Sequence, residues 1–334
     1  MSSVPTLGVV MPVYNEGDWV RRSVEALHRA AERADLELDV LVVDDGSTGD
    51  HPRVLDDLAD RGDIRLLRQE NAGRLAARSA GLAALDHDYV LLLDARVILH
   101  PDSLVTLVER LSEAPDSVWN AHVDVVSRGN PWAAFWAGIT KVGWRAYFAN
   151  PRRLTFGTED FDRYPKGTGA FAAPRRALLD AAGDFSSLYE DARFASDDTK
   201  LLRNVAASHR IGLDPGFSVD YHGRDSAGRW AKQVLFRGTT FVDGYVGTPR
   251  RAAMLLAALG LAVPAGLVVA WRAPRVAAAA AVAAPVAAGV AAAASGATAR
   301  EAGWVGVLLW PFTLIFGTGF VRGLVMALRG ARRR

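Results

Sequence analysis

The 334-residue sequence predicts an α/β domain with a mostly parallel sheet, followed by C-terminal transmembrane helices. In the front part of the chain, short apolar runs alternate with helical patterns of about three turns, as in βαβ units. Several of these runs end directly in carboxylates. After Arg251 the chain holds three long uncharged stretches, each long enough to cross a hydrocarbon layer of about 30 Å as a helix.

The expected strands are apolar runs, many of them β-branched, bounded by Gly, Asp or Pro. They lie at residues 7–13, 39–43, 64–67, 89–93, 118–126 and 211–219. Apolar residues at helical spacing predict the helices, and Pro52 fits the first turn of one of them. The expected helices lie at residues 18–34, 51–61, 74–85, 102–112, 174–182, 196–207 and 230–245. Residues 166–171 are expected to form a flexible segment, whose glycines allow a ligand to approach the backbone closely.

Asp94 directly follows the expected strand at residues 89–93, and Arg96 lies two positions later. A continuous apolar run of this kind is typical of a strand buried on both faces. Ligands of open parallel sheets bind beyond the carboxyl ends of the strands. We therefore expect Asp94 and Arg96 to face a ligand, although an Asp at this position is also a common turn residue.

Residues 131–148 carry six aromatic side chains, and Trp132, Phe135 and Trp136 share one side of the expected helix. A helix lying in the headgroup region of a membrane has this composition. A helix in the protein core has it too. Both interpretations stay open at the level of the sequence.

The candidate membrane spans are residues 252–271, 276–299 and 302–321. The middle stretch is mostly alanine, so a buried low-complexity helix is its alternative. Three full spans would leave the arginine-rich C-terminal segment outside, against the positive-inside tendency. We favour two spans with an interfacial or re-entrant third segment. The sequence thus predicts a catalytic domain at residues 1–245 and a membrane domain at residues 246–334.

Charge and cysteine content limit which binding partners and which cellular compartment the sequence predicts. The net charge of +2 gives no support for nucleic-acid binding, whereas Arg250-Arg251 and the arginines near the chain end suit an anionic cytoplasmic membrane surface. The first residues lead into a strand without the pattern of a signal peptide, so we expect the front domain in the cytosol. The absence of Cys excludes disulfides and thiolate metal sites.

Three carboxylate groups end or begin predicted elements: Asp44 with Asp45, Asp94, and Asp197 with Asp198. Carboxylates at strand ends and at a helix start can converge on one cleft. There they can hold a sugar nucleotide, hold a metal–phosphate pair or move a proton.

Together with these carboxylates, a series of motifs in this order resembles glycosyltransferase family 2. The motifs are VVMPVYNE at 9–16, VVDDGS at 42–47, NAGR at 71–74, LLDAR at 92–96, the segment 167–174, GDF at 183–185 and DDTKLL at 197–202. The resemblance covers roughly residues 5–245. It implies the GT-A fold, which is Rossmann-like, and inverting transfer from a nucleotide-sugar donor. The rear segment with GTGF at 317–320 looks like bacterial enzymes that build polysaccharide on lipid carriers.

The resemblance also implies roles for individual residues. It places Pro12, Tyr14, Glu16 and Gly169 at the nucleotide sugar, Asp45 or Asp44 at the base, most simply a uracil, and Arg74 at the nucleotide or its phosphates. Asp94 would contact the ribose or a metal. Asp198, beside Asp197, would be the general base that deprotonates the acceptor hydroxyl, an effect worth roughly 10²–10⁴-fold.

The chain departs from the family at the usual Asp-x-Asp motif, because Arg96 replaces the last Asp. That Asp holds Mg²⁺ or Mn²⁺ on the donor diphosphate, whereas an arginine is always cationic and can instead fork onto phosphate oxygens. One hypothesis is that Arg96 partly replaces the metal, and another is that a metal binds through Asp94 and His222 alone. A third is that Arg96 turns away and pairs with a carboxylate. No organic cofactor is expected.

These observations predict a membrane-anchored enzyme that transfers a sugar, favouring a UDP-sugar donor, to a polyprenyl-linked saccharide at the bilayer. The alternative acceptor is polyprenyl phosphate, which is already ionised and needs no base. An alternative of another class is a catalytically inactive membrane scaffold. Arg229-Trp230 lacks the Gln of the Gln-x-x-Arg-Trp motif of processive synthases, so one sugar is expected to be added per encounter.

Overall fold

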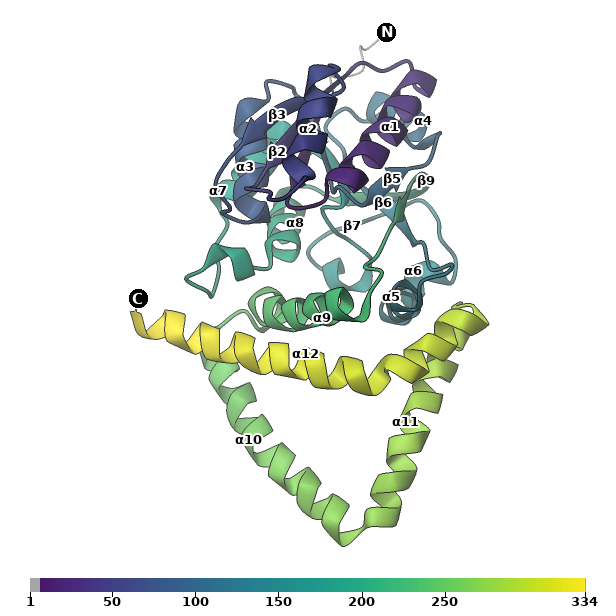
Figure 1. Ribbon diagram of the computed structural model, residues 1–334, viewed down its shortest axis with the longest axis vertical. Coiled ribbons are helices and arrows are strands. Elements are labelled where there is room, and N and C mark those ends of the chain that lie inside the picture. Colours follow the sequence, from purple (N-terminus) through teal and green to yellow (C-terminus); the bar gives the residue numbers. More distant parts are fainter. Residues whose placement is uncertain (1–6, 334) are drawn as a thin grey trace. The chain divides into compact units, whose positions relative to one another are not determined.

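The computed structural model describes residues 7–333, which divide into two compact units (Figure 1). The first, here called the sheet unit, contains the described residues up to 125 together with 150–185 and 197–222. The second, the helical unit, contains residues 126–149 and 186–196 together with the described residues from 223 onward. Compactness does not show where a membrane begins, so the domain boundary at residue 245 remains a prediction.

A nine-stranded mixed sheet organises the sheet unit, with the strand order β3-β2-β1-β4-β8-β6-β9-β5 and β7 paired to β9. The strands are β1 (Leu7–Val13), β2 (Leu38–Asp44), β3 (Arg65–Arg68), β4 (Tyr89–Leu93), β5 (Val97–Leu99), β6 (Val118–Val125), β7 (Leu154–Phe156), β8 (Ala170–Pro174) and β9 (Ile211–Tyr221). The pairings make β1, β2, β3, β4, β6 and β9 run in one direction, and β5, β7 and β8 oppose them. This direction brings the carboxyl ends of most strands to one edge, here called the carboxyl edge.

Helices cover both faces of this sheet. They are α1 (Gly17–Arg33), α2 (His51–Asp60), α3 (Arg74–Ala84), α4 (Ser103–Glu113), α7 (Arg175–Gly183), α8 (Asp197–Ser208) and the short η1 (Phe161–Arg163). Alternate residues of β1, such as Val9 and Met11, join the apolar core formed with α1, α2 and α4. On the opposite face Gly81 lets α3 approach Val10 of β1, because a Cβ atom there would lie 2.5 Å from its Cγ1. Strand β1 is therefore buried on both faces, as its apolar run indicates.

The predicted α/β class with mostly parallel strands is confirmed, but the expected flexible segment at residues 166–171 is partly wrong. Its end belongs to β8, which lies antiparallel between β4 and β6. The sequence of β8, AFAAP, is short and alanine-rich, so it lacks the β-branched signal of a strand. Strands β5 and β7 were missed as well, because three residues are too few to show a period.

The helical unit contains α5 (Pro131–Gly143), α6 (Arg145–Phe148), η2 (Ala192–Phe194), α9 (Ala227–Phe241), the π-helical η3 (Val242–Val246), α10 (Pro249–Arg272), α11 (Pro274–Ala294) and α12 (Ala299–Arg333). The aromatic helix expected at 131–148 is divided at Trp144 into α5 and α6. Phe135 and Trp136 of α5 are buried in an apolar cluster with Trp230 of α9 and Phe312 of α12. These two side chains therefore have the role of core residues.

Three helices, α10, α11 and α12, are long and apolar enough to cross a membrane by length and composition. The expected stretch 276–299 runs past the end of α11, because Gly296 adopts a left-handed φ of 86° and ends the helix. Within the helical unit α10 and α11 form a V, and α12 crosses between its open ends (Figure 1). In each of α10 and α11, only 6% of an apolar 18-residue stretch is buried. These helices present apolar side chains outward along their whole length, which associates the chain with a membrane.

Candidate active site

Five charged side chains of the sheet unit meet at the carboxyl edge and form what we call the arginine–carboxylate cluster. Its members are Asp94, which follows β4, Arg74 and Arg78 in α3, and Asp197 and Asp198 at the start of α8. Arg74 Nη2 lies 2.8 Å from Asp197 Oδ1, and Arg78 Nη2 lies 2.9 Å from Asp94 Oδ1. The two arginines stand one helical turn apart, so both reach the same side of α3.

Arg78 is the centre of the cluster, but the sequence pattern indicated only Arg74. Its Nη1 lies 2.5 Å from Asp197 Oδ2 and 3.0 Å from Asp198 Oδ1. The side chain is 1% exposed, and its Nε has no hydrogen-bond partner among the described residues. The signal that could have identified Arg78 is its i+4 spacing from Arg74 on a predicted helix.

Asp198 is held by three groups. Besides both arginines, the hydroxyl of Thr168 donates a hydrogen bond to Asp198 Oδ1. Burial raises the pKa of Asp198, but Arg74, Arg78 and the Thr168 hydroxyl outweigh it and hold the pKa well below the ordinary range. The carboxylate is therefore ionised, and its side chain remains 39% exposed.

Gly169 lies directly beside the cluster. The Asp94 amide donates to the Gly169 carbonyl at 2.9 Å, and a Cβ atom on Gly169 would lie 3.8 Å from Asp94 Oδ2. Strand β8, which begins at the next residue, pairs with β4 and fixes this loop next to Asp94. The structure thus brings together Gly169 and all four sequence-predicted members of the cluster: Arg74, Asp94, Asp197 and Asp198.

Asp44 and Asp45 end β2 and are each less than 5% exposed. Asp45 accepts hydrogen bonds from Gln69 Nε2 at 2.7 Å and from the amides of Ala72 and Gly73 at 2.9 Å. Asp44 accepts from the Ser47 amide at 2.9 Å. Both carboxylates therefore shape the loops that follow β2 and β3, and the role of either one at a nucleotide base stays a prediction.

The end of β1 and the loop after it carry Pro12, Tyr14 and Glu16, which the sequence predicted at the nucleotide. Pro12 is buried in β1, whereas Tyr14 is 50% exposed. The loop is fixed to the one after β2, because Thr48 donates its amide to Asn15 Oδ1 at 2.8 Å and the Asn15 amide donates to Ser47 Oγ at 2.9 Å. Asn15 and Thr48 also line a cavity of about 430 Å³ between these loops. Its place beyond β1 and β2 is the ligand position expected for a parallel sheet.

Arg96 is almost buried and lies 2.9 Å from Glu16 Oε2 through its Nε atom. Its guanidinium also lies 5.0 Å from the ring centre of Trp19. The structure therefore shows the arrangement in which Arg96 pairs with a carboxylate. The ring of His222 packs on the same Trp19, with ring centres 4.7 Å apart.

The residues at the end of β4 do not fit a divalent cation in this arrangement. Asp94 is paired with the guanidinium of Arg78, and Arg96 contributes a second positive charge. Burial lowers the pKa of His222, which favours its neutral form, and its ring packs against Trp19. Asp94 is the one anionic group of this pair and is already bound by Arg78, so we derive no catalytic step through a metal.

A sequence profile described as "Glycosyl transferase family 2" matches residues 8–180, just over half of the chain. The chain belongs to glycosyltransferase family 2. This match covers β1 to β8 with Arg74, Arg78 and Asp94, whereas Asp197 and Asp198 lie beyond it. The predicted family is thereby confirmed.

Three curated relatives of this chain come from bacteria. It is 30% identical over 118 residues to an undecaprenyl-phosphate 4-deoxy-4-formamido-L-arabinose transferase of Klebsiella pneumoniae, covering 34% of this chain and 36% of the relative. It is 31% identical over 135 residues to the uncharacterized glycosyltransferase YibD of Escherichia coli, covering 40% and 38%. The succinoglycan biosynthesis protein ExoO of Rhizobium meliloti is 28% identical over 127 residues, covering 38% and 36%. The chain thus spans little more than a third of the length of these relatives.

A solved structure resembles this chain over nearly its whole length. It is the mannosyltransferase PcManGT of Pyrobaculum calidifontis in complex with GDP-Man and Mn²⁺. The TM-score is 0.50 at 20% identity, and the match covers 98% of this chain and 86% of that one. At this identity the likeness concerns the fold, and it confirms the predicted glycosyltransferase fold.

Proposed function

We propose that this glycosyltransferase transfers one sugar, with inversion, from a nucleotide-sugar donor to a polyprenyl-linked saccharide held at the cytoplasmic membrane. The observation that carries the proposal is the arginine–carboxylate cluster, which gathers an ionised, partly exposed Asp198 and two arginines at the carboxyl edge of the sheet. The apolar helices α10 and α11 support an acceptor held by lipid. A UDP-sugar is the donor that we favour.

In the proposed reaction an acceptor oxygen forms a bond to the anomeric carbon while the bond from that carbon to the diphosphate breaks. Asp198 accepts the proton of the acceptor hydroxyl, and the nucleoside diphosphate leaves with the electron pair. Because negative charge develops on the diphosphate, preorganised cations lower the barrier. Arg74, whose side chain is 45% exposed, is the member of the cluster best placed to take that role. An α-linked donor then gives a β-linked product.

Arg74 cannot keep its ion pairs with Asp197 and Asp198 while it binds a diphosphate. In the structure it lies 2.8 Å from Asp197 and 3.9 Å from Asp198. When it turns to the diphosphate, Asp198 loses one of the charges that hold its pKa down and becomes a stronger base. Donor binding would thus prepare the base for the acceptor.

The metal requirement is part of the proposal. A divalent cation on the diphosphate would supply charge neutralisation. The structurally similar mannosyltransferase of Pyrobaculum calidifontis was solved in complex with GDP-Man and Mn²⁺. In this chain Arg96 stands where the last Asp of the motif would be, and we propose that guanidinium groups supply part of that charge.

We also propose that α10 and α11 span the membrane and that α12 lies along its surface. At 1.5 Å per residue, the 24 residues of α10 and the 21 of α11 reach across a layer of about 30 Å. On α12 the exposed apolar residues Val307, Leu314 and Val321 share one face, whereas Val305 and Leu308 on another face are buried. A helix of this kind suits the interface. Two spans keep the C-terminal arginines on the side of the catalytic domain, which we place in the cytosol.

A second candidate acceptor is polyprenyl phosphate. It is favoured by the low pKa of Asp198, because a strongly stabilised carboxylate is a weak base, and a phosphate acceptor needs none. The Klebsiella relative is named as an undecaprenyl-phosphate transferase.

The test is transfer from a panel of labelled nucleotide sugars by membranes that contain the full chain, with lipid extracts as the source of acceptor. Transfer to a lipid saccharide that Asp198→Asn reduces by roughly 10²-fold or more supports hydroxyl attack. Transfer to polyprenyl phosphate that Asp198→Asn leaves nearly unchanged supports the second candidate. Absence of both transfer and nucleotide-sugar binding by calorimetry would overturn the proposal and favour the inactive scaffold.

A further inference from the structure

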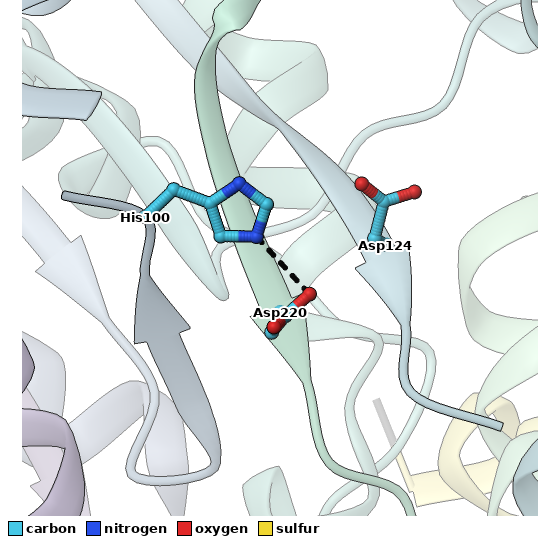
Figure 2. A group of neighbouring side chains, drawn as sticks. All are labelled: His100, Asp124 and Asp220. Carbon is cyan, nitrogen blue, oxygen red and sulfur yellow. Dashed lines mark ion pairs between the residues drawn. The ribbon is translucent and has the colours of Figure 1, made fainter. Parts of the chain in front are cut away.

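A separate group of possible metal ligands lies on the sheet unit, formed by His100, Asp124 and Asp220 (Figure 2). They come from three segments: His100 directly follows β5, Asp124 lies near the end of β6, and Asp220 lies near the end of β9. Each offers one ligand atom, and these atoms all lie within 4.8 Å of one another. His100 Nε2 is 3.1 Å from Asp220 Oδ1. We call this group the His–Asp–Asp triad.

Strand pairing, rather than flexible loops, brings the triad together. Asp124 and Asp220 are direct partners in the parallel pairing of β6 with β9. Ile98 of β5 pairs with Asp220, and His100 is two residues further along, so its side chain leaves the same face of the sheet. Two carboxylates placed opposite each other repel, and a cation between them would remove this cost.

Neighbouring side chains contact the triad and orient it, in the way that hydrogen-bond partners orient the ligands of a metal ion. Ser218 Oγ lies 2.9 Å from His100 Nδ1, which leaves Nε2 directed toward the carboxylates. His122, which is 8% exposed, places its Nε2 3.4 Å from Asp124 Oδ1. A ligating histidine usually has a polar partner on its other ring nitrogen, and a ligating carboxylate is usually contacted from behind.

We propose that the His–Asp–Asp triad is a binding site for a divalent transition-metal ion of the Mn²⁺ class. One imidazole nitrogen with two carboxylates is a mixed donor set that suits Mn²⁺ and Zn²⁺, whereas Mg²⁺ prefers oxygen alone. Three protein ligands leave coordination positions open. The side chains are 37–57% exposed, so water or a phosphate oxygen can occupy these positions.

The site would be distinct from the metal position that the family motif implies at Asp94, where Arg78 and Arg96 already supply positive charge. Asp124 and Asp220 nevertheless end strands that point to the carboxyl edge, as β4 does before Asp94. A bound ion would therefore add positive charge to the edge that carries the arginine–carboxylate cluster. The proposal concerns ion binding and does not depend on the proposed transfer reaction.

The experiment measures Mn²⁺ binding to the detergent-purified full chain after treatment with a chelator, by calorimetry and by pulsed electron paramagnetic resonance. We expect binding with a nitrogen hyperfine coupling from the His100 imidazole. His100→Ala and Asp220→Asn should each weaken binding by roughly tenfold or more, and Ser218→Ala should weaken it less. The matched controls Asp94→Asn and His222→Gln should leave the affinity and the nitrogen coupling unchanged.

Three results would overturn the proposal. The first is no binding of Mn²⁺ or Zn²⁺ up to millimolar concentration, which would make the triad a surface ion pair. The second is binding that survives His100→Ala but is lost in Asp94→Asn, which would place the ion at the family motif. The third is a bound Mn²⁺ without nitrogen coupling. Thermal unfolding of each variant confirms that the comparison is made on folded protein.

Discussion

Arg78 Nη2 lies 2.9 Å from Asp94 Oδ1, and the other terminal nitrogen of the same guanidinium contacts both Asp197 and Asp198. One buried cation thus joins the end of β4 to the start of α8. The group that would bind donor and the group that would activate acceptor are held at a fixed separation by this single side chain. Because a guanidinium has a rigid fork of donors, it can bridge three carboxylates where an ammonium cannot.

We therefore expect Arg78→Lys to fold and to lose roughly tenfold or more of transfer, since a lysine keeps the charge but loses the fork. Arg78→Met should also lower the free energy of unfolding by about 3 kcal/mol, because it removes one of the two cations that contact the buried carboxylate of Asp197. Labelled-sugar transfer and thermal unfolding measure the two effects. The control is Arg176→Met, which removes an exposed ion pair between Arg176 and Asp180, both on α7. Wild-type transfer by Arg78→Lys would contradict the bridging role.

Sequence patterns predicted the elements that bear the cluster better than they predicted the cluster itself. Asp94 follows β4, and Asp197 and Asp198 begin α8. The sequence could predict these positions because a long apolar run and a helix start are local signals. Arg78 lies in an ordinary RLAAR helix segment, and a burial of 1% depends on what packs over it. Thr168 was likewise hidden, because β8 has no strand signal of its own. Such positions require the tertiary fold.

Strand register explains the remaining gaps. The triad of His100, Asp124 and Asp220 depends on which residues of β6 and β9 stand opposite each other, and residues 124 and 220 are far apart in sequence. No local period encodes that register. Asp44 and Asp45 show a different limit of the sequence pattern. Carboxylates at a strand end are typical of ligand contacts, but these two accept hydrogen bonds from the loops that follow.

The pH dependence of transfer distinguishes the two acceptors. The wild-type pKa of Asp198 in the free enzyme lies well below the ordinary value because of Arg74 and Arg78. With a hydroxyl acceptor, kcat/KM for the donor, which reports the free enzyme, should therefore not fall on acidification to about pH 5. In Arg74→Gln one stabilising charge is gone and burial raises the pKa, so the acid limb should move upward. With polyprenyl phosphate the wild-type limb should lie near the second phosphate pKa of about 6.

The control for this profile is Arg21→Gln, which removes a half-buried arginine on α1 that lies 3.9 Å from Asp57. It should have the wild-type profile. An acid limb near neutral pH that Arg74→Gln does not move, with a hydroxyl acceptor, would contradict the role of Asp198 as base.

The pair of Arg96 and Glu16, 2.9 Å apart, gives a test of the altered family motif. If Arg96 supplies part of the positive charge on the diphosphate, transfer should persist in a strong chelator and fall by roughly 10²-fold in Arg96→Ala. Glu16→Gln, which releases Arg96 from its partner, should lower KM for the donor or leave it unchanged. The measurement is initial-rate kinetics with and without chelator. Complete inhibition by chelator, with Arg96→Ala nearly harmless, would refute this role.

Helices α9 and α12 approach each other closely at Gly238 and Gly319. A Cβ atom on Gly319 would collide with the carbonyl oxygen of Leu235 and lie 3.1 Å from the amide nitrogen of Thr239. Two residues earlier on α12, Gly317 has no neighbouring atom within 4 Å of its hypothetical Cβ. The two glycines thus provide a matched pair, one at the helix contact and one facing open space.

We expect Gly319→Ala to destabilise the helical unit by about 1–3 kcal/mol, because backbone atoms cannot yield as a side chain can. Gly317→Ala should be neutral or slightly stabilising, since alanine has the higher helix propensity by about 1 kcal/mol. The measurement is the thermal unfolding midpoint of the detergent-purified chain. Equal midpoints for the two variants would mean that α9 and α12 are not in backbone contact. A lower midpoint for Gly319→Ala alone would show that this contact holds the membrane-associated helices together.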